Sequence, residues 1–193
     1  MRERTVSKQE ERELIKRAKE CDSSAFARLY ECYYQDIYNY IYFRLPDVSQ
    51  AEDLTSEVFI KALESIGSFT FRGFPFSSWL FRIARNLMVD YFRGHPEPVD
   101  LPLEEETLPA ERGPSDVFER KLTQQRLARA LSNLTEDQQQ VVVLRFVDGL
   151  SNMEVAQVLG KSEGAIKSLQ YRALGSLNRF LEEAGSEGNS VLD

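Results

Sequence analysis

Apolar residues recur at intervals of three and four along most of the chain, which is the period of a helix with one buried face. No alternation of apolar and polar residues persists long enough to predict a β-strand. The expected helical segments are Ser7–Cys21, Ser24–Leu45, Ser49–Ile66, Ser77–Phe92, Ser115–Asn133, Thr135–Asp148 and two within Leu150–Leu177. The pattern predicts an all-α protein.

Several of these segments begin with a capping box, in which a Ser or Thr is followed three residues later by Glu or Gln. The pairs are Ser7 and Glu10, Ser49 and Glu52, Thr135 and Gln138, and Ser151 and Glu154. Proline or glycine ends other segments, at Pro46, Gly67 and Gly94. These signals place the expected helix boundaries.

A proline-rich, acidic stretch interrupts the helical pattern. Residues 95–114 contain five prolines, and Glu97–Glu119 holds eight acidic residues against Arg112. Such a composition favours a flexible linker over a long helix. We expect two helical domains, residues 1–94 and 115–184, joined by this acidic linker of residues 95–114. A small, polar, disordered tail is expected over residues 185–193.

The two segments within Leu150–Leu177 have the form of a helix-turn-helix. Gly160 separates them, and the second has an apolar face made by Ala165, Ile166, Leu169, Ala173 and Leu177. The other faces of this second helix carry Lys167, Ser168, Gln170, Tyr171 and Arg172, which could reach base edges and phosphates in a major groove. An ordinary helical hairpin would show the same turn spacing, so that alternative stays open.

Aromatic residues crowd the segment Phe69–Phe81, before and at the start of a predicted helix. Rings that stack on unpaired bases, next to arginines that hold the backbone, are typical of single-strand DNA binding. The candidates are Phe69, Phe71, Phe74, Phe76 and Trp79, followed on the helix by Arg82, Arg85, Asn86 and Arg93. The alternatives are that the aromatic residues all belong to the core and that the polar positions are a solvated face.

The segment Ser49–Leu63 predicts a helix with an acidic outer face. Glu52, Asp53 and Glu57 lie on this face, whereas Ala51, Leu54, Val58, Phe59 and Leu63 are expected to point inward. A compact acidic surface repels DNA and suits a basic protein partner. A plain solvated face is the alternative.

Composition limits the possible functions. The net charge of −7 argues against a protein that simply coats DNA, and Arg72–Arg93 and Lys161–Phe180 are locally basic. Two isolated cysteines, Cys21 and Cys32, and one histidine, His95, match no zinc motif. We expect no metal, no cofactor and no catalytic residues, because no phosphate-binding glycine loop or nucleophile motif is present. The charged N-terminus and the lack of a long apolar run predict a cytoplasmic protein without membrane insertion.

Together these segments resemble the small extracytoplasmic-function (ECF) group of bacterial RNA polymerase sigma factors. AEDLTSEVFIKAL at residues 51–63 resembles the helix that grips the polymerase β′ clamp helices. FSSWLFRIARNLMVDYFR at residues 76–93 resembles the segment that reads and melts the −10 element. Residues 131–174 resemble the domain that reads the −35 element and rests on the β flap.

The resemblance implies a sigma2-like helical bundle, a sigma4-like helix-turn-helix domain and a role for each candidate residue. Glu52, Asp53 and Glu57 would face core RNA polymerase. The aromatic segment with Arg82, Arg85, Asn86 and Arg93 would capture −10 DNA, and the exposed residues of the helix after Gly160 would meet the −35 duplex. An anti-sigma factor is a further partner usual for the group. The alternatives are a stand-alone helix-turn-helix regulator, which leaves the aromatic loop unexplained, and a helical adaptor that binds only proteins.

Overall fold

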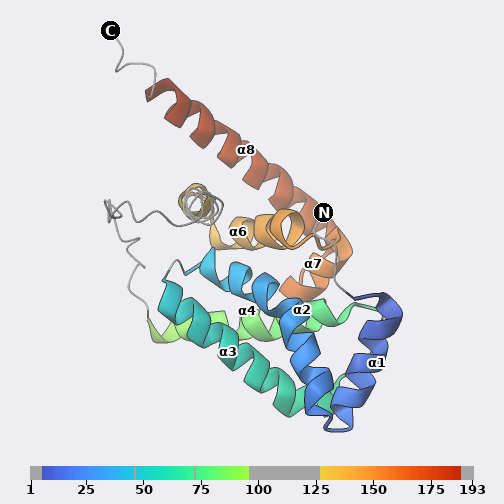
Figure 1. Ribbon diagram of the computed structural model, residues 1–193. Coiled ribbons are helices and arrows are strands. Elements are labelled where there is room, and N and C mark those ends of the chain that lie inside the picture. Colours follow the sequence, from blue (N-terminus) through green and yellow to red (C-terminus); the bar gives the residue numbers. More distant parts are fainter. Residues whose placement is uncertain (1–5, 46, 72, 96–126, 188–193) are drawn as a thin grey trace.

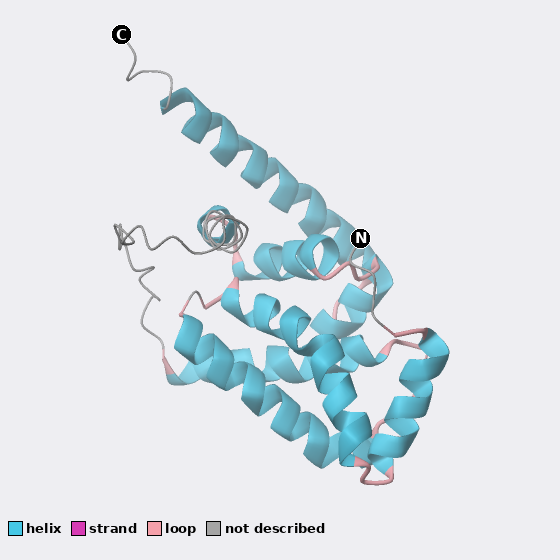
Figure 2. Ribbon diagram, in the orientation of Figure 1, coloured by secondary structure: helices cyan, strands magenta, loops and turns pink. Residues whose placement is uncertain are grey.

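The computed structural model describes residues 6–45, 47–71, 73–95 and 127–187, and every regular element in those ranges is helical (Figures 1 and 2). In chain order the elements are α1 (Lys8–Lys19), α2 (Ser23–Tyr42), α3 (Val48–Ser65), the short 3₁₀ turn η1 (Ile66–Ser68), α4 (Phe76–Gly94), α6 (Glu136–Val142), the π turn η2 (Val143–Val147), α7 (Asn152–Leu159) and α8 (Glu163–Glu187). The expectation of an all-α fold is confirmed. The expected linker and most of the helix predicted at residues 115–133 lie outside the described residues, although residues 127–132 are helical.

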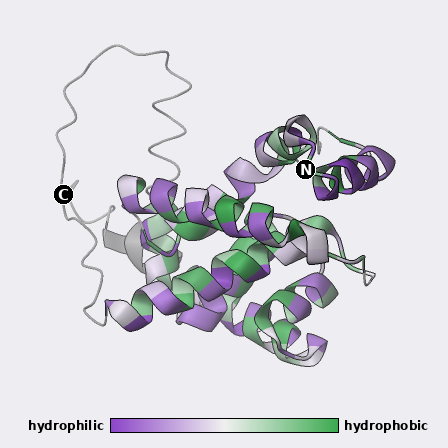
Figure 3. Cartoon of the chain, turned by 90° about the horizontal axis from the view of Figure 1, so that it is seen from below, coloured by the Kyte–Doolittle hydropathy of each residue, from purple (hydrophilic) through white to green (hydrophobic). Residues whose placement is uncertain are grey.

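The N-terminal unit is a bundle of α1 to α4, in which α2 packs against each of the other three helices. Its core is rich in aromatic side chains, and Tyr40, Phe76 and Phe81 are each no more than 1% exposed. The Tyr40 and Phe81 rings meet edge to face, with their centroids 5.5 Å apart. Apolar stripes face inward along these helices while their outer faces are polar, as the green and purple bands of Figure 3 show.

One helix of this bundle begins at a different cap from the one predicted. Asp47, not Ser49, caps α3, because its carboxylate accepts a hydrogen bond from the Gln50 amide at 2.8 Å. The capping box predicted at Ser49 is therefore wrong: Ser49 lies inside the first turn. Asp22 caps α2 in the same way, through the amides of Ser24 and Ala25.

The C-terminal unit follows the predicted helix-turn-helix. The capping boxes at Thr135 and Ser151 are both present, and Gly160 ends α7 with a φ of 65°. The helix expected over Thr135–Asp148 is not a regular α-helix throughout, because it widens into the π turn η2 after Val142. Helix α8 continues to Glu187, past the position at which the tail was expected to begin.

The two units pack directly against each other, with α4 beside α7 (Figure 1). The Arg44 side chain, only 1% exposed, forms a 2.6 Å ion pair with Glu136. Gln139 donates to the Phe43 carbonyl oxygen at 2.5 Å, and the Tyr40 hydroxyl donates to Gln140 at 3.3 Å. Burial raises the pKa of Tyr40, so this phenol stays neutral beside Arg44.

In the part of the chain that the structure describes, no helix combines the length and apolar character needed to cross a bilayer.

Candidate nucleic-acid interface

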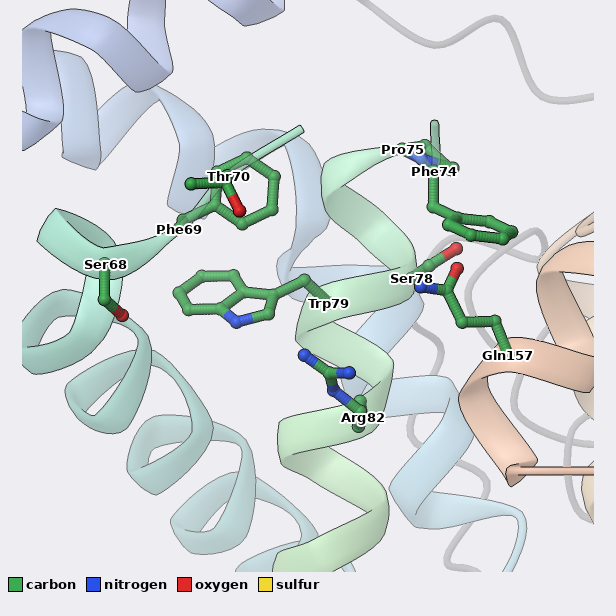
Figure 4. A pocket seen from close by; sticks show the side chains of 9 residues that line it. All are labelled: Ser68, Phe69, Thr70, Phe74, Pro75, Ser78, Trp79, Arg82 and Gln157. Carbon is green, nitrogen blue, oxygen red and sulfur yellow. The ribbon is translucent and has the colours of Figure 1, made fainter. Parts of the chain in front are cut away.

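A cavity of about 290 Å³ opens where the aromatic segment meets the start of α4 (Figure 4). Its lining comes from η1, the loop that follows, the first two turns of α4 and one residue of α7. The lining residues are Ser68, Phe69, Thr70, Phe74, Pro75, Ser78, Trp79, Arg82 and Gln157. An aromatic cavity with a guanidinium at its edge can hold a planar, hydrogen-bonding group such as a nucleobase.

Local backbone chemistry explains why the cavity forms here. The chain leaves η1 at Phe69, turns through Gly73 with a φ of 84°, and enters α4 after Pro75, whose fixed φ of −67° suits a position before a helix. The Phe69 and Trp79 rings lie 5.1 Å apart between centroids, and Figure 4 shows both beside the cavity. The loop and the helix thus form its two walls.

The structure divides the predicted aromatic residues between core and surface. Phe76 is 1% exposed and packs against Tyr33 and Trp79, so it has no free face for a base. The ring completes the core of the bundle in this conformation, and a contact of Phe76 with DNA stays a prediction. Phe71 is 43% exposed, whereas Phe74 and Trp79 are half-buried at the cavity. Phe69 is buried but still lines the cavity.

The predicted polar face of α4 begins at the cavity and runs along the helix. Arg82, Asn86 and Arg93 are all exposed, and Arg82 also lines the cavity. Arg93 forms a 3.1 Å ion pair with Asp90, while Arg85 is half-buried beside this face. The structure therefore places a basic, hydrogen-bonding track next to an aromatic cavity.

Helix α8 presents most of its predicted DNA-contacting residues to solvent. Tyr171 is 82% exposed, and Lys167, Ser168 and Arg172 are exposed as well. Lys167 pairs with Glu163 at 2.8 Å, and the Arg172 Nε donates to the Ser168 carbonyl oxygen at 3.3 Å, so both cations lie along the outer helix face. Gln170 is half-buried and stands at the edge of this surface.

The acidic face of α3 carries Glu52, Asp53 and Glu57, all exposed as predicted. Leu63 was expected to point inward, and this is wrong: Leu63 is 52% exposed, because Ala62 takes the core position one residue earlier. Ile60 is 57% exposed on the same helix. Ile60 was not among the predicted residues, and together with Leu63 it suits the acidic face to a protein partner better than to water alone. The exposure of Leu63 could have been predicted, because Ala62 continues the apolar helical period and Leu63, one residue later, points to a different face.

One lining residue crosses between the units. Gln157 lies on α7, the first helix of the helix-turn-helix, yet it faces the cavity close to Phe74 and Ser78 (Figure 4). Trp79 and Arg82 line the same cavity from α4. In this arrangement the C-terminal unit therefore contributes one side chain to the lining of the cavity.

Comparison with known proteins identifies both units. Residues 29–96 match the model of the Sigma-70 region 2 family, and residues 124–177 match that of Sigma-70, region 4. The ECF RNA polymerase sigma factor BldN of Streptomyces coelicolor is 44% identical over 173 residues, covering 89% of this chain and 66% of BldN. The ECF RNA polymerase sigma factor SigX of Bacillus subtilis is 33% identical over 168 residues, covering 81% of this chain and 84% of SigX.

Solved structures show the same architecture. CnrH, in complex with the cytosolic domain of CnrY, is similar with a TM-score of 0.70 and 26% identity, over 90% of this chain and 98% of CnrH. The sigma factor RpoE, in complex with the anti-sigma factor NepR from Bartonella quintana, has a TM-score of 0.61 and 26% identity, over 81% of this chain and 96% of RpoE. The chain belongs to the ECF group of RNA polymerase sigma factors, which direct promoter-specific transcription.

Proposed function

We propose that the two units of this sigma factor read two promoter elements in two different physical states. The cavity between the aromatic loop and α4 captures a flipped base of the −10 element, and the outer face of α8 reads the −35 element as duplex. The single observation that carries the proposal is the cavity itself, because Phe69, Phe74 and Trp79 line it and Arg82 stands at its edge. Stacking and phosphate contacts there would offset the lost base pairing.

Within this mechanism the predicted residues other than the buried Phe76 keep roles that fit their exposure. Phe71, Phe74, Trp79 and Arg82 surround the captured base, and Arg85, Asn86 and Arg93 hold the strand that leads to it. Phe69 is buried and supports the loop by packing against Phe71 and Trp79. Lys167, Ser168, Gln170, Tyr171 and Arg172 meet the major groove and its phosphates.

The acidic face of α3 binds the β′ clamp helices of core RNA polymerase, through Glu52, Asp53 and Glu57. Ile60 and Leu63 add apolar contact area beside these charges. The C-terminal unit rests on the β flap. A chain of net charge −7 binds DNA weakly by itself, so attachment to the polymerase supplies a high effective concentration at the promoter.

Promoter binding requires the two units to separate. The −35 and −10 elements lie about 25 base pairs apart, which is about 85 Å at 3.4 Å per base pair. Helices α4 and α7 are in direct contact, and Gln157 of α7 lines the cavity, so the two elements cannot both be bound in this arrangement. An anti-sigma factor, of the kind that RpoE binds, would act by holding the units in such a state.

The test is transcription by core polymerase on a pool of genomic promoter fragments, with and without this protein. We expect new discrete transcripts that Arg172→Ala weakens and that the pair Asp53→Ala and Glu57→Ala abolishes. The matched control is Glu20→Ala with Glu31→Ala, which removes two exposed acids outside α3 and should leave transcription unchanged. Duplex binding without any polymerase-dependent initiation would instead favour the stand-alone regulator.

A further inference from the structure

Helix α1 carries a row of basic residues that no role has yet explained. Lys8, Arg12, Lys16 and Lys19 are spaced at i, i+4, i+8 and i+11, so they lie on one face of the helix, and all four are exposed. We call these four residues the basic face of α1. None of them pairs with a carboxylate among the described residues, whereas Arg17 on another face pairs with Asp22 at 2.7 Å. The matched family model begins at residue 29 and does not include α1.

This basic face is joined to the loop that forms the cavity. The Lys19 ammonium donates to the Phe69 carbonyl oxygen at 3.0 Å, and Phe69 lines the cavity. The Arg12 guanidinium lies over the Phe71 ring, 5.5 Å from its centroid. Two of the four cations therefore hold the loop, while Lys8 and Lys16 extend the positive charge along the helix.

We call Arg82, Asn86 and Arg93 the α4 track, and α1 lies at the opposite end of α4 from Arg93. Helix α1 lies beside the Phe76 end of α4 and away from its Gly94 end (Figure 1). A strand whose base occupies the cavity continues in two directions. Arg82, Asn86 and Arg93 lie along α4 in one direction. In the other direction the basic face of α1 contacts the loop that walls the cavity, through Lys19 at Phe69 and Arg12 at Phe71.

We propose that the basic face of α1 binds the phosphates of the single strand as it leaves the cavity on the side opposite the α4 track. The inference rests on the proposed function, because it needs a base held in the cavity. From Lys8 to Lys19 the face extends about 16 Å, which spans several phosphates. Four cations on one surface, none paired with a carboxylate of the described residues, are complementary to a polyanion, and the acids of α1 lie on its other faces.

The experiment measures how the affinity of the holoenzyme, core polymerase with this sigma factor, for a promoter depends on salt. The promoter is one identified by the transcription test, and it is used with its −10 region already unpaired. Each phosphate contact on a single strand contributes about 0.7 to the slope of log K against log salt. The double variant Lys8→Gln with Lys16→Gln should therefore have a slope that is less steep by about 1.4. The wild type should lose about sevenfold more affinity than the variant between 50 and 200 mM salt. The matched control, Arg17→Gln with Arg28→Gln, removes two charges outside the face.

A second probe, whose single strand ends at the captured base, separates this contact from all others. On that probe the variant and the wild type should bind equally, because the phosphates in question are missing. Equal slopes for variant and wild type on the full pre-melted promoter would overturn the proposal. An equal loss of affinity of the variant on both probes would also overturn it, and the basic face would then be assigned to an acidic protein partner. If the wild-type holoenzyme initiates at no promoter, the proposed function fails first.

Lys19 is assigned a positioning role, and its test has a different readout. Lys19→Met removes the bond to the Phe69 carbonyl and should reduce the discrimination between bases at the captured position. Lys19→Arg keeps a donor and should restore the discrimination. Unchanged base preference in Lys19→Met would remove Lys19 from this role.

Discussion

The two DNA-reading surfaces of this chain are built in opposite ways. The α8 surface is convex, comes from one helix, and consists of consecutive turns whose outer residues are already apparent in the helical period. The cavity is concave and combines η1, a loop, α4 and one residue of α7. A duplex presents its base edges outward, so a single exposed helix suffices to read it. An unpaired base has to be enclosed, and enclosure requires a tertiary structure.

The largest expected effect is on stability, and it differs between an aromatic residue of the core and one on the surface. Phe76→Ala should lower the free energy of unfolding by about 3–5 kcal/mol, because it leaves a cavity in the packed core of the bundle. Tyr171→Ala on α8 should change the free energy of unfolding by no more than about 0.5 kcal/mol, since its ring is 82% exposed. Urea unfolding followed by the fluorescence of the single tryptophan, Trp79, measures both. A Phe76→Ala variant as stable as the wild type would show that this ring does not contribute to the packing of the core.

The second prediction concerns the convex surface alone. Arg172→Ala should weaken holoenzyme binding to promoter duplex by about 1–3 kcal/mol, or roughly fivefold to 150-fold, because it removes an exposed guanidinium that can bind a guanine edge or a phosphate. Arg179→Ala, two helical turns further along α8, is the matched control and should bind nearly as well as the wild type. Filter binding at fixed salt measures the difference. Equal losses for the two variants would mean that α8 contributes only its overall charge.

The interface between the units offers a third, smaller effect. Glu136→Ala should weaken the docking of the units by about 1–2 kcal/mol, because it leaves the Arg44 guanidinium buried without its carboxylate. Small-angle scattering should then report a larger radius of gyration. Asp137→Ala is the control: it removes the neighbouring acid of α6, whose 2.9 Å partner Lys161 belongs to the same unit. If both variants stay compact, the Arg44 ion pair does not hold the units together.

Features determined by local sequence could be predicted, whereas features assembled across the chain could not. The helices, the Ser151 capping box, the Gly160 turn and the exposed residues of α8 all follow from spacing within one or two turns. Whether Phe76 or Phe71 would be buried could not be read from the segment, because both are aromatic and the answer depends on Tyr33 and Trp79. Gln157 reaches the cavity, and Lys19 of α1 reaches the Phe69 carbonyl beside it, only through tertiary packing.

The smallest effect comes from two turns that share one geometry but not one residue. Cys21 follows α1 with a φ of 64°, and Gly160 follows α7 with a φ of 65°. In each turn the next amide bonds back five residues, from Asp22 to the Arg17 carbonyl at 3.1 Å and from Lys161 to the Ala156 carbonyl at 2.9 Å. The N-terminal unit thus tolerates a side chain in a conformation that favours glycine.

Cys21→Gly should therefore raise the free energy of unfolding by up to about 1 kcal/mol, and Gly160→Ala should lower it by about 1 kcal/mol. A Cβ at Gly160 would meet no atom within 4 Å, so the cost there is conformational and not a clash. Urea unfolding measures both, and Cys21→Ala is the control because it removes the thiol but keeps the strained backbone. A gain in Cys21→Ala equal to that in Cys21→Gly would show that the thiol, and not the left-handed backbone, makes the first turn the weaker of the two.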